Sequence, residues 1–404
     1  MNKIELLAPA KDVGKAKIAI LYGADAVYVG GKQFSLRSRA SNFSMDDLRE
    51  IVTFAHEHNA KLYVTVNMVF HDEDLPGIRE YLKELEEIGV DAIIVSSIGI
   101  IKLVQQIAPK IEAHVSTQIS TVNSGAVTFF KNEGAKRVVL ARECSIEDIE
   151  QIAQRDIVPL EVFIHGGMCS NYSGRCVLSN RMTNRDANRG GCAHSCRWKY
   201  RLYAGDKELS DPNEPLSFSS KDLRATAYIP RMIKCGVASL KIEGRMKSDY
   251  YIAQVVKTYR KLIDEVYEKG DLSEERIAYY ENELDKAENR PSADGFLSGI
   301  CDESKQLYGV NGAGVTHDYV ALVKDYDPVK GLATIEVKNR FAVGDQLEVF
   351  GPTIDNYIFE NKALFSLKHE FVSLANKPTE LLYLRTPIEL HKDDMIRKVH
   401  INVD

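Results

Sequence analysis

The stretch Tyr22–Gly31, "YGADAVYVGG", contains the pattern that organises most of the chain. A helix-forming segment ends at Gly23, and a valine-rich apolar run follows almost at once. The same arrangement returns in "EIGVDAIIVSS" at Glu87–Ser97 and in "NEGAKRVVLAR" at Asn132–Arg142. Glycine commonly ends helices, and continuous apolar runs are typical of parallel strands buried on both faces. The pattern therefore predicts successive units of one β-strand and one α-helix.

The whole chain contains eight such apolar runs, which begin at Ile4, Ala26, Leu62, Ala92, Glu112, Arg137, Glu161 and Ser239. Between them lie helical patterns, two of which start at the good N-cap residues Ser44 and Ser145, while a third ends at Gly89. Eight units of this kind predict an α/β fold, a (β/α)8 TIM-like barrel. A doubly wound open sheet is the alternative.

Two interruptions of this pattern define the expected domains. A long insertion at about 167–230 separates the seventh run from the eighth, so that residues 1–304 form a barrel-like catalytic domain with an insertion. Beyond it the chain reads as short strands and turns, which predicts a small β-barrel domain at 305–404. A charged helical segment at 256–290 is expected to bridge the two domains.

The composition is that of a soluble globular protein. The chain has 404 residues, 44% of them hydrophobic, and a net charge of −6, which excludes a protein that is basic overall. No apolar stretch approaches the roughly 20 residues of a membrane span, and no signal peptide is visible at the N-terminus. We therefore expect a cytoplasmic protein without a membrane partner.

Four of the seven cysteines lie in one segment, "CSNYSGRCVLSNRMTNRDANRGGCAHSC", as Cys169, Cys176, Cys192 and Cys196. In a reducing compartment, clustered cysteines are more often metal ligands or catalysts than disulfides. The spacings C-x6-C and C-x3-C are wider than the pairs of zinc ribbons, and they favour an iron–sulfur cluster over zinc or free thiols. Cys235 is expected to be a small buried residue or a substitute ligand.

In a barrel of this type, function lies at the C-terminal ends of the strands. Several polar side chains stand there, and the insertion, which starts directly after strand seven, is expected to cover them. From this set we take His165, Glu243 and Arg245 as candidate catalytic residues. The alternative for each is a hydrogen-bonded polar group of the barrel.

The insertion and the last strand end are locally basic, although the chain is acidic overall. A positive field over the barrel mouth attracts a dicarboxylate, a phosphate or an RNA backbone. The candidate substrate-binding residues are Arg142, Arg175, Arg197, Arg224 and Lys241. Trp198, the only tryptophan, either packs the insertion onto the barrel or stacks on a base.

Three long motifs resemble peptidase family U32. They are "EVFIHGGMCSNYSGRCVLS", "NRDANRGGCAHSCRWKY" and "SLKIEGRMKSDYYIAQVVKTYRKLID", and the resemblance covers nearly the whole chain. Members of this family are understood as oxygen-independent hydroxylation proteins that carry a [4Fe–4S] cluster. Some act in ubiquinone synthesis, one on ribosomal RNA and one on tRNA. Arg224 in "SSKDLRATAYI" stands where several relatives have cysteine, and it makes the chain most similar to the tRNA branch.

This resemblance implies a specific function. The tRNA branch makes 5-hydroxyuridine at the wobble position of the anticodon loop and takes the hydroxyl group from prephenate. It also implies that the four cysteines of the insertion hold the cluster, with zinc as the alternative metal. The other hypotheses are an rRNA hydroxylase, a peptidase or collagenase, and a non-catalytic RNA-binding protein with structural zinc. The chain has no G-x-S-x-G or H-E-x-x-H motif to support peptidase chemistry, and no motif that indicates its oligomeric state.

Overall fold

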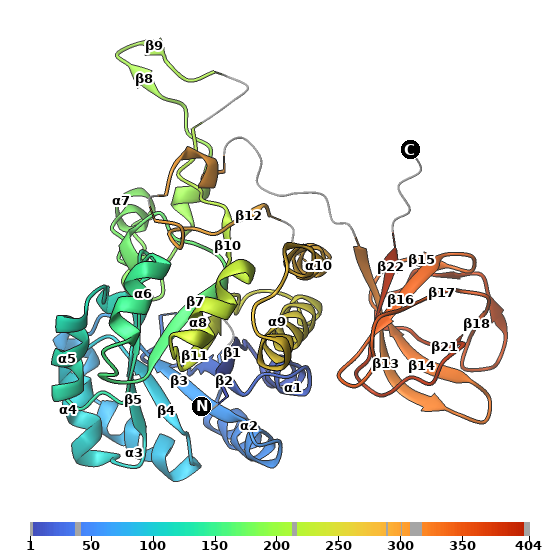
Figure 1. Cartoon of the computed structure of the whole chain (residues 1–404). Coiled ribbons are helices and arrows are strands. Elements are labelled where there is room, and N and C mark those ends of the chain that lie inside the picture. Colours follow the sequence, from blue (N-terminus) through green and yellow to red (C-terminus); the bar gives the residue numbers. More distant parts are fainter. Residues whose placement is uncertain are drawn as a thin grey trace.

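The computed structural model describes residues 3–36, 42–211, 216–287, 290–299, 301–307 and 317–399. The larger domain is a closed barrel of eight parallel strands (Figure 1). Closure comes from β11 (Ser239–Ile242), which pairs in parallel with both β1 (Glu5–Pro9) and β7 (Leu160–Gly166). The strands between these two are β2 (Ala26–Gly30), β3 (Lys61–Val66), β4 (Ala92–Val95), β5 (Glu112–Val115) and β6 (Arg137–Val139). The predicted (β/α)8 barrel is confirmed, and the open sheet is wrong because β7 and β11 join the edges.

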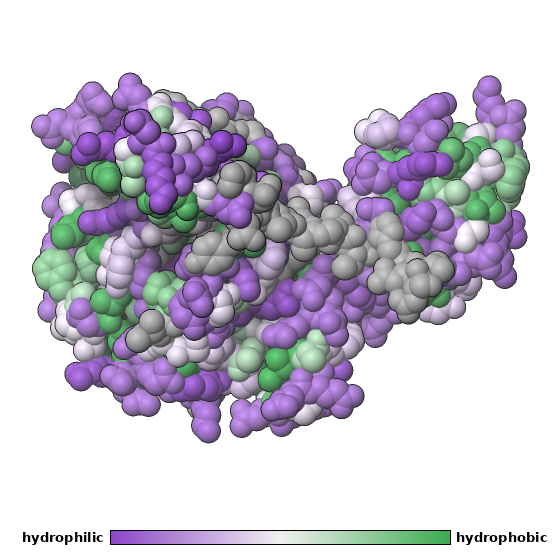
Figure 2. Space-filling model, turned by 90° about the horizontal axis from the view of Figure 1, so that it is seen from above, coloured by the Kyte–Doolittle hydropathy of each residue, from purple (hydrophilic) through white to green (hydrophobic). Residues whose placement is uncertain are grey.

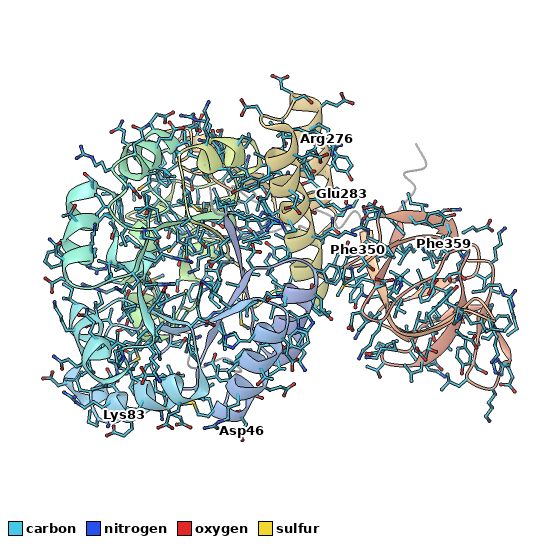
Figure 3. The ribbon with its side chains drawn as sticks, turned by 60° about the horizontal axis from the view of Figure 1, so that its bottom comes forward. Asp46, Lys83, Arg276, Glu283, Phe350 and Phe359 are labelled. Carbon is cyan, nitrogen blue, oxygen red and sulfur yellow. The ribbon has the colours of Figure 1, made fainter. Side chains whose placement is uncertain are left out.

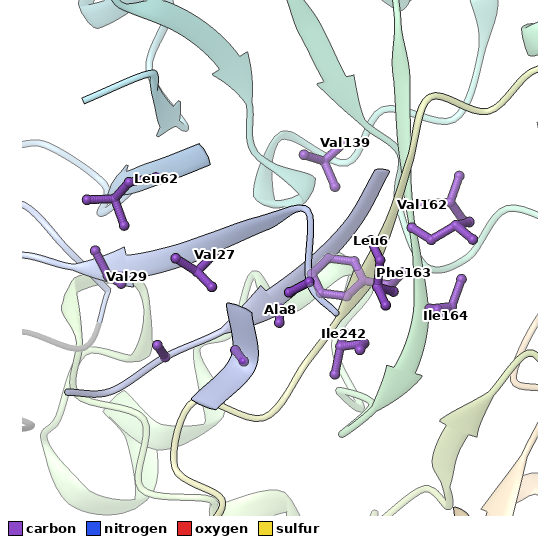
Figure 4. Close-up of a cluster of buried hydrophobic side chains, with 14 of the residues drawn as sticks. Leu6, Ala8, Val27, Val29, Leu62, Val139, Val162, Phe163, Ile164 and Ile242 are labelled. Carbon is purple, nitrogen blue, oxygen red and sulfur yellow. The ribbon is translucent and has the colours of Figure 1, made fainter. Parts of the chain in front are cut away.

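Alternate strand residues face two different cores. Leu6 and Ala8 of β1 belong to the large outer core between the sheet and the helices, whereas Leu7 belongs to a small inner cluster. In β2, Val27 and Val29 likewise face outward, and Tyr28 faces the barrel interior. Figure 4 shows the outer core around these strands. Both faces are buried, which is why each strand reads as a continuous apolar run.

The helices outside the barrel begin and end at capping residues. Ser44 and Ser145 form capping boxes at two N-termini, and Gly89, with φ of 89°, ends α3. The helix bounds are α1 (Val13–Leu21), α2 (Met45–Glu57), α3 (Ile78–Ile88), α4 (Ile98–Ile107), α5 (Ser124–Asn132), α6 (Ile146–Ala153), α8 (Ile229–Lys234) and α9 (Asp249–Lys269). None of the described helices has the length and apolar composition needed to cross a membrane.

The segment between β7 and β11 contains little regular structure. It includes the short helix α7 (Leu178–Thr183), a hairpin of β8 (Tyr203–Ala204) and β9 (Lys207–Glu208), and β10 (Asp222–Arg224), which pairs antiparallel with β7. Short 3-10 turns lie at Tyr172–Gly174, Ala187–Arg189 and Ser195–Arg197. The hairpin projects beyond α7 at the top of the barrel domain (Figure 1). The insertion thus lies over one end of the barrel.

The small domain is an antiparallel half-barrel with its own apolar core. Its strands are β13 (His317–Asp327), β14 (Leu332–Val337), β15 (Phe341–Ala342), β16 (Gln346–Phe350), β17 (Tyr357–Glu360), β18 (Leu364–Phe365), β19 (Phe371–Val372), β20 (Leu374–Ala375), β21 (Leu381–Arg385) and β22 (Met395–Val399). Seen from above, it forms a separate lobe with a mostly hydrophilic surface (Figure 2). The predicted boundary after residue 304 lies close to residues 308–316, which are outside the described ranges.

The two domains meet along α9 and α10 (Glu274–Asp285), the helical segment that was expected to bridge them. Arg397 of β22 is fully buried there and donates to Glu348 at 2.7 Å and to the Oε1 of Gln254 on α9 at 2.8 Å. Figure 3 shows Glu283 on α10 and Phe350 on the side of the small domain that faces this helix. A buried, hydrogen-bonded arginine therefore joins the half-barrel to the barrel domain.

Replacing Arg397 with methionine should weaken this junction. The change leaves the buried Glu348 carboxylate without its closest cation, and breaking a buried pair typically costs about 3–5 kcal/mol. We expect a lower urea midpoint for unfolding of the small domain. Lys368→Met, at an exposed position, is the control and should leave the midpoint unchanged. Equal midpoints for the two variants would contradict the prediction.

Candidate active site

A cavity of about 560 Å³ opens at the C-terminal ends of the barrel strands, below the insertion. Its wall combines residues inside the strands, such as Tyr28 and Phe163, with residues just beyond them, such as Asn67 and Ser116. Among the residues that the structure describes, seven Lys and Arg side chains line it, against two acidic ones, Asp222 and Glu243. The cations are Arg142, Arg185, Arg197, Lys241, Arg245, Lys247 and Arg290. The cavity is therefore suited to an anionic small molecule.

Most of the residues predicted from the sequence line this cavity. They are Cys169, Cys176, Cys192, Cys196, Arg142, Arg197, Lys241, Glu243 and Arg245. Three do not: the exposed Arg175 donates to the carbonyl of Gln118 at 2.6 Å, Arg224 pairs with Asp285 on α10, and His165 is buried behind the wall. Cys235 is also absent from the wall, and its thiol contacts the carbonyl of Met232 at 3.4 Å.

Lys241 links the cavity to a buried ion network inside the barrel. Its ammonium donates to the fully buried Glu161 at 2.7 Å and lies over the rings of Tyr28 and Phe163, at 4.5 and 5.3 Å from their centroids. Burial is the main cause that lowers the pKa of Lys241, and Glu161 opposes it. The lysine is thereby fixed in one position between the cavity and the interior of the barrel.

The network continues toward the other end of the barrel. Glu161 accepts from Arg137 at 3.2 Å, and Arg137 also donates to Glu5. The hydroxyls of Tyr63 and Ser239 also donate to the Glu5 carboxylate, at 2.6 and 2.8 Å. These residues were not predicted from the sequence as part of the site. A signal was present, because a charged residue inside an apolar strand run must find a partner when it is buried.

Arg245 reaches the cavity through a gap that glycine leaves open. Its Nη1 lies 3.4 Å from the hydroxyl of Thr65, and a Cβ atom added to Gly30 would stand only 2.5 Å from that nitrogen. Gly166 has φ of 100°, and a Cβ there would lie 2.4 Å from the backbone oxygen of Glu243. Both glycines therefore allow the residues that follow β11 to approach the neighbouring strands closely.

Arg142 and Glu243 line the wall on either side of β7, since they follow its two neighbours, β6 and β11. The Arg142 guanidinium lies 3.9 Å from the centroid of the Phe163 ring. Burial raises the pKa of the Cys169 thiol, and the positive charge of Arg142 partly opposes this larger effect. Glu243 accepts from the backbone N–H of Gly167 at 3.3 Å. Glu243 thus places a carboxylate on the wall beside several fixed cations.

The four cysteines of the insertion surround a common space. All of them line the cavity, and the proximity of Cys196 and Cys176 raises the pKa of Cys169 in addition to the larger effect of burial. Within the described ranges, no three His, Cys, Asp or Glu side chains are grouped closely enough to hold a metal ion. Four thiolates around one cavity are the donor set of an iron–sulfur cluster, so the residues present fit that group chemically.

Comparison with known proteins decides the family. The model of peptidase family U32 matches residues 11–306, and the model of the U32 C-terminal domain matches residues 315–397. The chain belongs to peptidase family U32. The first match covers the barrel with its insertion and the second covers the half-barrel, so the family spans both domains.

Relatives of this U32 protein carry names that refer to RNA. It is 42% identical to tRNA hydroxylation protein P1 of Bacillus subtilis, over 98% of this chain and 95% of that protein. It is 34% identical to tRNA hydroxylation protein P of Escherichia coli, over 96% and 95%. It is also 39% identical to the 23S rRNA 5-hydroxycytidine C2501 synthase of E. coli, but over 74% of this chain and only 46% of that protein.

His165 of this U32 protein has an environment that keeps its ring neutral. The side chain is 1% exposed, its Nδ1 lies 3.3 Å from the hydroxyl of Tyr259, and the ring of Tyr251 lies close by. Burial, helped by the charge of Arg224, lowers its pKa to about 3. His165 therefore does not donate a proton near neutral pH, and its contacts are those of a residue that positions the end of β7.

This low pKa predicts how stability depends on pH. Below the unfolded pKa of about 6.5, the unfolded chain binds a proton that folded His165 does not, so stability falls as the pH drops toward 3. The loss at pH 5 is about 2 kcal/mol from this residue. We expect His165→Gln to lose correspondingly less stability between pH 7 and pH 5 in urea unfolding, and the exposed-site control His58→Gln to behave like the wild type. The same loss in all three proteins would refute the prediction.

Proposed function

We propose that this U32 protein is a cytoplasmic RNA-modifying enzyme that hydroxylates the wobble uridine of tRNA to 5-hydroxyuridine, with prephenate as hydroxyl donor and a [4Fe–4S] cluster as cofactor. One observation carries the proposal: a cation-rich cavity lined by four cysteines, in a chain 42% identical over nearly its full length to a tRNA hydroxylation protein. When bound, such a cluster supplies one-electron transfer and Lewis-acidic iron.

The residues of the cavity wall suit a small dicarboxylate. Arg142 follows β6, whereas Lys241 and Arg245 lie at the end of β11, and together they place positive charge around one space. Arg142 and Lys241 are held against the ring of Phe163, and Lys241 also by Glu161, so little side-chain freedom is lost on binding. Guanidinium groups bind carboxylates through paired hydrogen bonds. In this proposal the three cations hold and orient the carboxylates of prephenate.

The proposed reaction exchanges two groups between carbon atoms. At uridine, the C5–H bond breaks and a C5–O bond forms, so uridine is oxidised by two electrons. At prephenate, the C–O bond breaks and a C–H bond takes its place, so prephenate is reduced by the same two electrons. Glu243, on the cavity wall, is the carboxylate that can accept the C5 proton. A wobble base lies in a single-stranded loop, so its entry into a pocket costs little unstacking energy.

Two alternatives are weighed against this proposal. Peptidase chemistry is favoured by a relative from Porphyromonas gingivalis that is named collagenase and is 33% identical over 87% of this chain, but the chain has no G-x-S-x-G or H-E-x-x-H motif. Hydroxylation of ribosomal RNA is favoured by the 39% identity to an rRNA 5-hydroxycytidine synthase. The tRNA assignment is preferred because similarity to the tRNA proteins extends over both domains, whereas that relative is matched over less than half of its length.

Nucleoside analysis of cells that lack this protein tests the proposal. Mass spectrometry should find that 5-hydroxyuridine and its derivatives have disappeared from tRNA, while 5-hydroxycytidine in ribosomal RNA is unchanged. Loss of the rRNA nucleoside alone would assign the protein to the rRNA reaction. Unchanged levels in both RNA pools, in a strain without a redundant enzyme, would end the hydroxylase proposal.

Gly30→Ala tests the role of Arg245 in donor binding. The new methyl group would stand 2.5 Å from Nη1 of Arg245 and 2.7 Å from the hydroxyl of Ser35, and it should displace these two side-chain ends without unfolding the barrel. Loss of a charge-assisted hydrogen bond, about 1.5 kcal/mol or more, should raise the prephenate concentration for half-maximal rate about tenfold. The exposed Gly99→Ala on α4 is the control. An unchanged half-maximal concentration would remove Arg245 from the donor site.

A further inference from the structure

Three aromatic side chains form a ladder on the insertion, next to the cysteine cavity. Ring centroids are 6.4 Å apart between Trp198 and Tyr200 and 5.8 Å apart between Tyr200 and Phe218. The inner ring is fixed, because the hydroxyl of Tyr200 donates to the carbonyl of Ser195 at 2.7 Å. The two outer members are open to solvent, with Trp198 42% and Phe218 49% exposed. We call these three residues the aromatic ladder.

The ladder is tied directly to the cavity wall. The backbone N–H of Phe218 donates to the carbonyl of Cys196 at 3.1 Å, and Tyr200 exchanges two backbone hydrogen bonds with Leu216, at 2.8 and 2.9 Å. Cys196 and Arg197, which directly precede Trp198, both line the cavity. The exposed rings therefore have a fixed position at its edge and do not belong to a separate surface patch.

Packing the insertion onto the barrel does not account for the outer rings. Neither Trp198 nor Phe218 belongs to the hydrophobic cores or to the residues packed against them. Large apolar side chains that stay exposed at a fixed place commonly mark an interaction site. The ladder brings two such side chains next to one ring, that of Tyr200, although they lie on either side of the hairpin in the chain, so a role in binding explains it better than a role in stability.

The charges around the ladder indicate a polyanion. Between Cys169 and Arg201 the chain has seven Lys and Arg residues and one acidic residue, Asp186, although the whole chain has a net charge of −6. The hairpin that follows carries Asp206 and Glu208, and Glu208 lies 3.7 Å from Arg201, so the excess of positive charge lies on the cysteine side of the ladder in the sequence. Within the ladder segment, "RWKYR" alternates basic and aromatic residues, and Lys199 and Arg201 are exposed. Proteins that bind single-stranded nucleic acid combine the same two elements: aromatic rings that stack on bases, and cations that follow the backbone.

We propose that the aromatic ladder is a stacking platform for the unpaired RNA bases that flank the target base. The proposal rests on the RNA-modifying function and adds the place where the loop is held. A base stacked on Trp198 or Phe218 leaves its neighbour at the entrance of the cavity, while Lys199 and Arg201 neutralise the adjoining phosphates. A base-paired stem offers no open base faces, so the platform selects single-stranded loops.

Intrinsic fluorescence tests this directly, because Trp198 is the only tryptophan in the chain. Full-length protein with its cofactor is titrated, without prephenate, with a synthetic anticodon stem-loop RNA and with a blunt duplex of the same stem. Stacking should quench the Trp198 emission in a saturable manner with the stem-loop and not with the duplex. Absence of quenching with both RNAs would overturn the proposal.

Variants separate stacking from charge. Trp198→Ala and Phe218→Ala should each weaken stem-loop binding at least about fivefold at constant salt, since stacking on one ring contributes about 1 kcal/mol or more. Trp198→Phe should restore most of the affinity because the ring is kept. Phe129→Ala, at an exposed aromatic residue on α5 that does not line the cavity, is the matched control and should bind like the wild type. Thermal melting and the visible spectrum verify that fold and cofactor are retained.

Nucleoside analysis of the same variants distinguishes this proposal from the proposed function. If the alanine variants bind and hydroxylate the stem-loop as well as the wild type does, the ladder proposal fails while the hydroxylase proposal stands. If the wild type makes no hydroxylated nucleoside in any RNA, the function itself fails, whatever the fluorescence shows. A dimer that dissociates in Trp198→Ala, without any RNA effect, would assign the ladder to protein contact and overturn the proposal.

Discussion

A buried chain of charges across the closing seam of the barrel underlies the rest of the structure. Three ion pairs form this chain: Lys241 on β11 with Glu161 on β7, Glu161 with Arg137 on β6, and Arg137 with Glu5 on β1. These strands lie at and beside the junction where the sheet closes on itself. Lys241, Glu161 and Arg137 are buried and Glu5 is half-buried, so each depends on its neighbour to offset the cost of leaving water. The network therefore favours one register of closure over its alternatives.

The same network gives the cavity its charge. Lys241 is the only member of the chain of ion pairs that lines the cavity, and its partner Glu161 lies wholly beneath the surface. Because Glu161 binds Lys241 from the interior of the barrel, the positive charge of Lys241 lies between that interior and the cavity lined by the cysteines. Arg142 and Arg245 add charge from neighbouring strand ends, and the parallel arrangement brings all of these ends to one rim. The electrostatics of the site are thus a consequence of barrel closure.

The insertion adds what a bare barrel lacks. Its four cysteines form one side of the cavity, and its aromatic ladder continues from Cys196 toward solvent. In the proposed function, two parts of the chain therefore have different tasks: the strand ends bind the small anion, and the insertion faces the RNA. The half-barrel is joined to α9 and α10 through Arg397, which donates to Gln254 and lies 3.8 Å from Glu283.

The amino-acid sequence by itself determined the barrel, the half-barrel and the position of the cysteines after strand seven, because strand periodicity, helix caps and motif spacing are local properties. It also identified Lys241, Arg245 and Arg142 as strand-end cations. It did not distinguish them from Arg224 and Arg175, which are just as basic, and of which Arg175 is adjacent to Cys176 in the chain. Only tertiary packing decided this: Asp285 on α10 pairs with Arg224, and the carbonyl of Gln118 binds Arg175. The neutral state of His165 and the partners of Glu161 were likewise decided by the fold, since burial and ion pairing depend on residues that are distant in sequence.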